Sequence, residues 1–302
     1  MSYFTAAKPL CRPCEGAVEV VIRPSEKDLG GFSVRRVLPS DARRSVGPFA
    51  FFDHMGPAEF PPGTGVNVRS HPHIGLATIT YLFEGEILHR DSLGYVQPIR
   101  PGEINWMTAG KGIVHSEKVT PEIFESGQKL HGLQTWVALP TEAEEIEPSF
   151  EHYPAGDIPC VDENGATIRV VLGSAFGISS PVTTQSETLY VEVILEPGRS
   201  VEIPEAEELA VYVVEGSVAV NDQFVETGVL AVLEQRANGT VTAESVARIM
   251  FVGGDALDGE RHIWWNFVSS SRARIEQAKQ DWREQRFDSV PGESDFVPLP
   301  GR

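Results

Sequence analysis

The chain has 302 residues, with 43 acidic and 25 basic side chains, a formal net charge of −18 and a hydrophobic content of 41%. This composition is typical of a folded protein, and the length allows two ordinary domains or one large β-domain. Because phosphate binding depends on clustered Lys and Arg, the acidic balance argues against nucleic acid as a direct partner. The sequence has no apolar run of about 18 residues, so no membrane-spanning helix is expected.

The N-terminal residues and the cysteines bear on the cellular compartment. The opening stretch, MSYFTAAKPLCRPCEG, lacks the apolar core flanked by basic residues that is typical of a signal peptide. Cys11, Cys14 and Cys160 are an odd number of cysteines, which favours a reducing compartment over a disulfide framework. We therefore expect a cytoplasmic protein, and we interpret the C-x-x-C pair of Cys11 and Cys14 as two incidental thiols.

Most of the chain has the pattern of short β-strands separated by Gly and Pro turns. In chain order, the strand-like segments are EVVIRP, FSVRRVL, LATITYLF, TIRVVLG, TLYVEVILEPG, LAVYVVEGSVAV and GVLAVLEQ. A helix is predicted in SSSRARIEQAKQDWREQRF, where serines can cap the start and Ile275, Ala278 and Trp282 share one face. The preceding Trp264 and Trp265 are expected to pack this helix onto the core. The predicted fold class is therefore all-β with a C-terminal α-helix.

An internal repeat divides the chain into two halves. The segment YLFEGE from Tyr81 resembles YVVEGS from Tyr212, and each is followed by a second strand and then by a third strand led by a glycine. This shared order indicates a duplicated small β-barrel. The stretch LPTEAEEIEPSFEHYPAGDIPC is rich in Glu and Pro and fits a boundary. We predict an N-terminal metal-binding domain over residues 1–145 and a C-terminal domain over residues 146–302.

Two histidines open the apolar strand of the first half. His71 and His73 are two residues apart, so in a strand they point to the same face. Buried imidazoles without partners are costly, and a metal ion would satisfy them. Downstream, WMTAGKGIVHSEKV supplies His115 and Glu117 at the same spacing. We expect this second pair on a facing strand, brought over the first pair by a turn at the glycines Gly110 and Gly112.

Three imidazoles and one carboxylate suit a divalent first-row metal such as Fe, Mn, Co, Ni, Cu or Zn. The absence of a thiolate from this set argues against a closed structural zinc site. A four-ligand site on an octahedral metal leaves open positions, which implies chemistry or small-ligand binding. The second half has no histidine between His152 and His262, and the repeat places Glu202 and Pro204 where the first half has its histidine pair. We expect no metal ligands in that half.

Three further histidines of the first half lie outside the two predicted ligand pairs. For His54 and His131, a hydrogen-bonded role in the core or a turn and a role beside the metal ligands remain open alternatives. His89 lies in the predicted hairpin LHRDSLG, and we expect it to be exposed.

These motifs resemble the cupin superfamily and, within it, the pirin family. Five residues separate Gly65 from His71 and Gly85 ends the motif, as in cupins, but Ala77 or Thr78 stands at the usual glutamate position. The stretches GPFAFFDHMGP, WMTAGKGIVHSE, HGLQTWVALP and RHIWWNFVSSS also match pirins, so the resemblance covers nearly the whole chain. The stretch HPHIGLAT departs from the more usual pirin HPHRGFET, which bears on pocket polarity and substrate preference rather than on the ligands.

The resemblance implies two packed cupin barrels, a bicupin, with His71, His73, His115 and Glu117 as metal ligands in the first barrel and Fe²⁺ as the expected metal. It also implies two alternative functions. An enzyme of this family would be a quercetin 2,3-dioxygenase-like oxidoreductase that uses a small aromatic flavonol and dioxygen, with Glu117 as the catalytic base. A non-enzymatic member would sense redox state through iron and bind a partner protein. Apolar barrel walls and open metal positions favour the enzyme.

Overall fold

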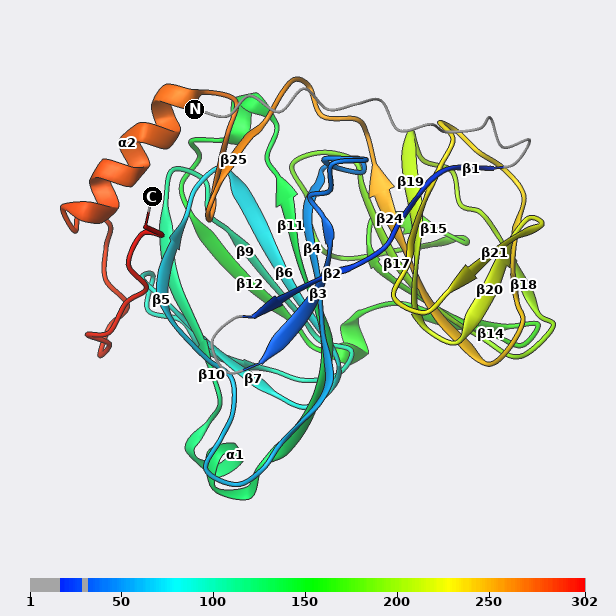
Figure 1. The fold of residues 1–302 in the computed structure, drawn as a ribbon, viewed down its shortest axis with the longest axis horizontal. Helices are drawn as coiled ribbons and strands as arrows, with labels where there is room; N and C mark the ends of the chain where they lie inside the picture. The colour runs from blue at the N-terminus through cyan, green and yellow to red at the C-terminus, as the bar shows by residue number, and fades with distance from the viewer. Residues whose placement is uncertain (1–16, 29–31, 302) are drawn as a thin grey trace.

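The computed structural model describes residues 17–28 and 32–301. Across these residues, two barrels each combine a seven-stranded antiparallel sheet with a four-stranded one (Figure 1). The predicted all-β class, the two barrels and the C-terminal helix are confirmed. Cys11 and Cys14 lie outside the described residues. No helix within the described ranges is long and apolar enough to cross a membrane.

Strands β2 to β12 form the first barrel. Its larger sheet has the order β12-β9-β6-β11-β4-β3-β2, and its smaller sheet has the order β5-β10-β7-β8. The strands are β2 (Ser25–Asp28), β3 (Ser33–Leu38), β4 (Phe49–Phe60), β5 (Asn67–His73), β6 (Leu76–Glu84), β7 (Ile87–Asp91), β8 (Val96–Ile99), β9 (Ile104–Thr108), β10 (Ile113–Lys118), β11 (Gln128–Ala138) and β12 (Ser149–Tyr153). Three short helices accompany them: α1 (Pro121–Ser126), η1 (Thr141–Ala143) and η2 (Ala155–Asp157).

The second barrel repeats this plan. Its larger sheet has the order β1-β22-β19-β24-β17-β14-β13, and its smaller sheet has the order β18-β23-β20-β21. The strands are β1 (Val18–Ile22), β13 (Cys160–Glu163), β14 (Ala166–Leu172), β17 (Thr188–Leu195), β18 (Ser200–Glu202), β19 (Glu208–Glu215), β20 (Ser217–Val220), β21 (Gln223–Glu226), β22 (Leu230–Leu233), β23 (Thr240–Ala243) and β24 (Ala247–Gly254). The remaining elements are the hairpins β15 (Ser174–Ala175) with β16 (Ile178–Ser179) and β25 (His262–Trp264) with β26 (Phe267–Ser269), and the helix α2 (Arg272–Arg283).

The two ends of the chain cross to the opposite barrels. Strand β1 pairs with β22 of the second barrel, whereas β26 and α2 pack against the first barrel (Figure 1). Bridges join Ile74 to Phe267 and Ser70 to Phe296, so the returning segment contacts β5 on both sides of its histidine pair. The domain boundary near residue 145 stays a prediction, but each barrel is completed by a segment from the other end of the chain.

Helix α2 forms as the sequence predicts. Ser271 caps it by accepting a hydrogen bond from the backbone N–H of Arg274, and Ile275, Ala278 and Trp282 are its buried residues. This apolar face packs onto the first barrel, which is the usual source of stability for a helix of this length. Trp265 contacts the Trp282 ring, with centroids 6.4 Å apart, in agreement with the expected packing role.

The barrels meet through their larger sheets in a shared apolar cluster that contains a few hydrogen-bonded polar groups. His54 is buried here, with Nδ1 2.6 Å from the Tyr212 hydroxyl and Nε2 2.7 Å from Nε2 of His131. Burial, assisted by Arg35, lowers the pKa of His54 to about 2. Of the two alternatives left open for His54 and His131, the structure supports the hydrogen-bonded core role.

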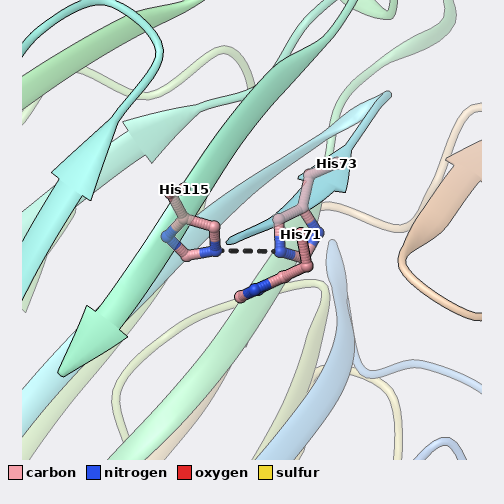
Figure 2. Close-up of side chains that lie close together, drawn as sticks. All are labelled: His71, His73 and His115. Atoms are coloured by element: carbon pink, nitrogen blue, oxygen red, sulfur yellow. Dashed lines mark hydrogen bonds between the residues drawn. The ribbon is translucent and has the colours of Figure 1, made fainter. Parts of the chain in front are cut away.

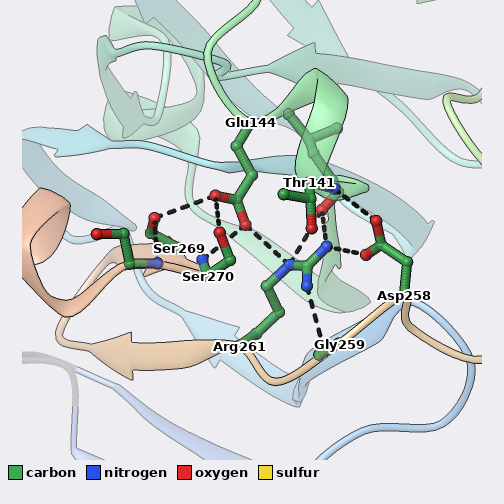
Figure 3. Close-up of polar contacts among 9 residues, drawn as sticks. Thr141, Glu144, Asp258, Gly259, Arg261, Ser269 and Ser270 are labelled. Atoms are coloured by element: carbon green, nitrogen blue, oxygen red, sulfur yellow. Dashed lines mark hydrogen bonds and ion pairs between the residues drawn. The ribbon is translucent and has the colours of Figure 1, made fainter.

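A buried ion pair fixes the path of the chain back to the first barrel (Figure 3). Nε of Arg261 lies 2.9 Å from a carboxylate oxygen of Glu144, and the guanidinium also pairs with Asp258. Glu144 also accepts hydrogen bonds from the Ser269 hydroxyl at 3.1 Å and the Ser270 backbone N–H at 2.7 Å. Because these groups are satisfied together, the segment at β26 is held beside the first barrel.

Candidate metal centre

The two predicted ligand pairs lie on adjacent strands of one sheet. Strand β10 pairs antiparallel with β5, and His115 stands opposite His71 in the register. We expected the second pair on a facing strand, and this was wrong: it lies on the neighbouring strand of the same sheet. Directly opposed residues of neighbouring strands have their Cβ atoms about 5 Å apart, which is close enough for the two side chains to share a metal. His71, His73 and His115 converge (Figure 2), and the nitrogen atoms they offer all lie within 4.8 Å of one another.

Two glycines in left-handed conformations shape the ends of these strands. Gly75, just after His73, has φ +67°, and a Cβ there would stand 2.0 Å from the carbonyl oxygen of Val268. Gly110 has φ +49°, and a Cβ there would stand 2.0 Å from the carbonyl oxygen of Ile146. Both sites therefore require glycine. The predicted glycine turn before His115 is confirmed at Gly110.

Main-chain carbonyls orient two of the three imidazoles. Nδ1 of His71 lies 2.9 Å from the carbonyl oxygen of Arg69, and Nδ1 of His73 lies 3.1 Å from that of Asn266. Since a carbonyl oxygen only accepts, each Nδ1 carries the proton and each Nε2 keeps a free lone pair. Nε2 of His73 lies 3.1 Å from Nε2 of His115, so lone pairs are directed into the space between the rings.

All three imidazoles are buried and neutral. Burial lowers the pKa of His71 to about 4, and it lowers the pKa values of His73 and His115 well below the ordinary value for histidine. Neutral imidazole is the form that coordinates a metal. Three such rings, with nitrogen atoms within 4.8 Å of one another, fit a divalent transition metal.

Glu117 faces the same cavity as His71 and His73. A register irregularity between His115 and Glu117 shifts its pairing on β5 to Val68. One carboxylate oxygen lies 3.4 Å from the Thr80 hydroxyl, and burial raises the pKa of Glu117 to about 7. Within the described residues, the compact group of possible ligands contains the three histidines without this carboxylate. The ligand role of Glu117 therefore stays a prediction.

His89 is buried, with 5% of its surface exposed, so its expected exposure was wrong. Strand β7 is an interior strand of the smaller sheet, between β10 and β8, and the His89 ring stacks on Phe150 with centroids 4.4 Å apart. Its Nε2 lies 3.0 Å from a carboxylate oxygen of Asp91. A signal for this pair was present in the sequence, because His89 and Asp91 have the two-residue spacing of the ligand pairs.

A cavity of about 390 Å³ opens beside the histidines. One wall is aromatic, since Phe51 and Trp136 stack with centroids 3.9 Å apart and Trp136 meets the His73 ring edge to face at 5.1 Å. The Arg36 guanidinium covers the other face of Phe51 at 4.3 Å and forms two hydrogen bonds, of 2.7 and 2.8 Å, with Asp53. The space suits a flat, largely apolar ligand.

The returning C-terminal segment supplies part of this cavity. Trp265, Asn266 and Val297 line it together with residues from the first half of the chain. The sequence assigned Trp265 to packing alone, and it offered no local signal for Asn266 or Val297. Their contribution depends on a chain segment almost 200 residues beyond His73 in the sequence, as the His73–Asn266 contact shows.

The corresponding part of the second barrel is filled. Val201 on β18 and Val241 on β23 are buried in a continuous apolar cluster, and Ile203 belongs to the same cluster. Glu202, which the repeat places at a histidine position, is exposed. In the described part of this barrel, no group of three His, Cys, Asp or Glu side chains is close enough to hold a metal.

Comparisons with known proteins agree with this architecture. Residues 31–137 match the family described as Pirin, and residues 190–288 match the Pirin C-terminal cupin domain. A pirin-like protein of Caulobacter vibrioides is 47% identical over 94% of this chain and 99% of its own length. Human Pirin is 32% identical over 85% of this chain and 88% of its own length.

A solved structure extends this similarity to three dimensions. The crystal structure of quercetin 2,3-dioxygenase from Acinetobacter baumannii superposes with a TM-score of 0.87 at 32% identity, covering 94% of this chain and 95% of that protein. The chain therefore belongs to the pirin family, and its two barrels are cupin domains.

Proposed function

We propose that this protein is a metal-dependent dioxygenase of the quercetinase type, which acts on a flavonol or a similar flat aromatic compound. The observation that carries the proposal is a cluster of three buried histidines, two of which, His71 and His73, line an aromatic cavity of about 390 Å³. The similarity to the quercetin 2,3-dioxygenase of Acinetobacter baumannii supports the same reaction class.

His71, His73 and His115 would hold the metal, with Glu117 as a fourth ligand. Fe²⁺ is the expected ion, and Mn, Co, Ni, Cu or Zn would also suit this donor set. When bound, the metal supplies a Lewis acid that lowers the pKa of a substrate hydroxyl at an open position.

The protein side chains then provide orientation and proton transfer. Phe51 and Trp136 give the cavity an apolar aromatic wall beside which an aromatic substrate can lie. Glu117, which lines the same cavity as His71 and His73, would accept the hydroxyl proton. Trp265 and Val297 add apolar surface to the cavity lining, which would help to exclude water.

Oxygen uptake by protein loaded anaerobically with Fe²⁺ tests this function. With quercetin as substrate, we expect oxygen consumption and release of carbon monoxide, and we expect Glu117→Gln to lower the rate about 100-fold or more. His152→Asn, on the outer strand β12, serves as a control variant with unchanged rate. A failure to consume oxygen with any flavonol at full iron occupancy would overturn the proposal.

The alternative function, an iron-dependent redox-sensing regulator that binds a partner protein, stays a prediction. It would use the same histidines, so ligand variants do not separate the two functions. The oxygen-uptake assay does, because a regulator needs no turnover.

A further inference from the structure

His115 differs from the other two histidines in what holds its Nδ1 atom. His71 and His73 bond to main-chain carbonyls, whereas Nδ1 of His115 lies 3.4 Å from Nδ1 of His89, a side chain on the neighbouring strand β7. The second nitrogen of His89, Nε2, lies 3.0 Å from Oδ2 of Asp91. A buried chain of contacts thus runs from Asp91 through His89 to the back of His115.

Proton positions along this chain follow from the chemistry of its ends. The Asp91 carboxylate only accepts, so Nε2 of His89 carries a proton. An imidazole whose proton is held at Nε2 presents the lone pair of Nδ1, and Nδ1 of His89 lies within reach of Nδ1 of His115 as an acceptor. His115 must then donate from its own Nδ1, which leaves the lone pair of its Nε2 directed toward Nε2 of His73, 3.1 Å away.

The chain of contacts is also held rigidly. Oδ1 of Asp91 accepts hydrogen bonds from the backbone N–H groups of Leu93 at 2.9 Å and Tyr95 at 3.0 Å, so its other oxygen is fixed toward His89. Asp91 has no exposed surface, and Phe150 stacks on the His89 ring at an interplanar angle of 16°. Both side chains are therefore buried and held by contacts other than the one they make with each other.

We infer that Asp91 and His89 are positioning residues that hold His115 in the tautomer able to bind the metal. This inference rests on the metal site of the proposed function, but not on its reaction. Partners of this kind fix the ring orientation and raise the basicity of a ligating histidine, and their loss typically costs about 10- to 100-fold in metal affinity.

Asp91→Asn is the sharpest test because it is isosteric. The two backbone N–H groups would keep the amide oxygen in place, so the amide NH₂ would face Nε2 of His89 and donate to it. The proton of His89 would then move to Nδ1, which makes Nδ1 of His115 an acceptor and places a proton on its Nε2. The substitution therefore converts the ligand to the wrong tautomer without removing any atom of the site.

Two substitutions of His89 separate this effect from a loss of packing. His89→Leu removes the acceptor for His115. His89→Asn keeps an acceptor for His115, because the side-chain oxygen of asparagine can occupy a position close to that of Nδ1 in His89. His152→Asn is the matched control, since His152 also bonds to a side chain, Asn105, but lies on the outer strand β12.

Titration with Co²⁺ alone measures both affinity and coordination, the latter through the visible absorption of the bound ion. We expect Asp91→Asn and His89→Leu to bind Co²⁺ about 10- to 100-fold more weakly with a changed spectrum, and His89→Asn to stay within about threefold of the unchanged protein. Unchanged affinity and spectrum in Asp91→Asn and His89→Leu would overturn the inference, as would equal losses in His89→Asn and His89→Leu. If the protein without any substitution fails to bind Co²⁺, the proposed metal site itself is overturned.

Discussion

The two barrels share one strand plan but have different interiors. In the second barrel a single apolar cluster, rich in valine, fills the space between the sheets. In the first barrel the apolar residues form two separate clusters, one around Trp136 and Phe150 and the other around Met55 and Leu130. The cavity of about 390 Å³ is lined by residues of both clusters, including Trp136 and Met55.

Residue type on the smaller sheet accounts for this difference. The first barrel has His71 on β5 and His115 on β10, whereas the second has Val201 on β18 and Val241 on β23. Valine side chains pack closely on a pleated surface and need no polar partner. Histidines need a partner for each ring nitrogen, and the space beside His71 and His73 is an open cavity. The same backbone plan therefore encloses a packed apolar core in one half and a cavity lined by histidines in the other.

Removing a ligand from the first barrel should have the largest effect. His115→Ala is expected to weaken metal binding by about 10²- to 10³-fold, because in the proposed four-ligand set each ligand would contribute roughly a quarter of a typical binding free energy of about 10–16 kcal/mol. Metal analysis after dialysis measures this loss, and circular dichroism should show an intact β fold. Unchanged metal content would show that the site lies elsewhere.

Acid should destabilise the interface between the two barrels, where His54 is buried. The pKa of His54 is lowered to about 2 in the folded protein, against 6.5 for the ordinary group. Its neutral form therefore contributes stability that is complete above pH 6.5 and is lost as the pH falls toward 2. Between pH 6.5 and 4.5 we expect a loss of up to about 2.5 kcal/mol in the free energy of unfolding.

Urea unfolding at several pH values measures this dependence. His54→Gln cannot be protonated in this range, so the variant should lose less stability between pH 6.5 and 4.5. Equal pH dependence in the variant and the unchanged protein would contradict a neutral His54 at the interface.

A matched pair of valine substitutions should show the smallest effect and the clearest contrast. Val241 in the filled barrel has no exposed surface. Val241→Ala removes two methyl groups there and should lower the free energy of unfolding by about 2 kcal/mol. Val68 is half-buried and lines the cavity. Val68→Ala should therefore lower the free energy of unfolding by less than about 1 kcal/mol. Equal losses in urea unfolding would mean that the first barrel is packed as tightly as the second.

Much of this architecture follows from local patterns in the sequence. The repeat from Tyr81 and Tyr212 predicts two barrels, and the two-residue spacing of His71 and His73 predicts their common face. Ser271 and the apolar face of α2 predict the terminal helix. The common face of the histidine pair and the terminal helix depend on strand and helix periodicity and on capping, which involve residues close together in the chain.

Tertiary structure decided the rest, because it depends on contacts between segments far apart in the sequence. The hydrogen bond from His73 to Asn266, the burial of His89 against Phe150 and the pairing of β1 in the opposite barrel each join such segments. Strand adjacency likewise placed His115 beside His71 rather than across the barrel from it. The sequence by itself determined which side chains could bind a metal. For His73 and His115, contacts with distant segments decided what holds Nδ1, whereas the carbonyl of Arg69 in the same strand holds that of His71.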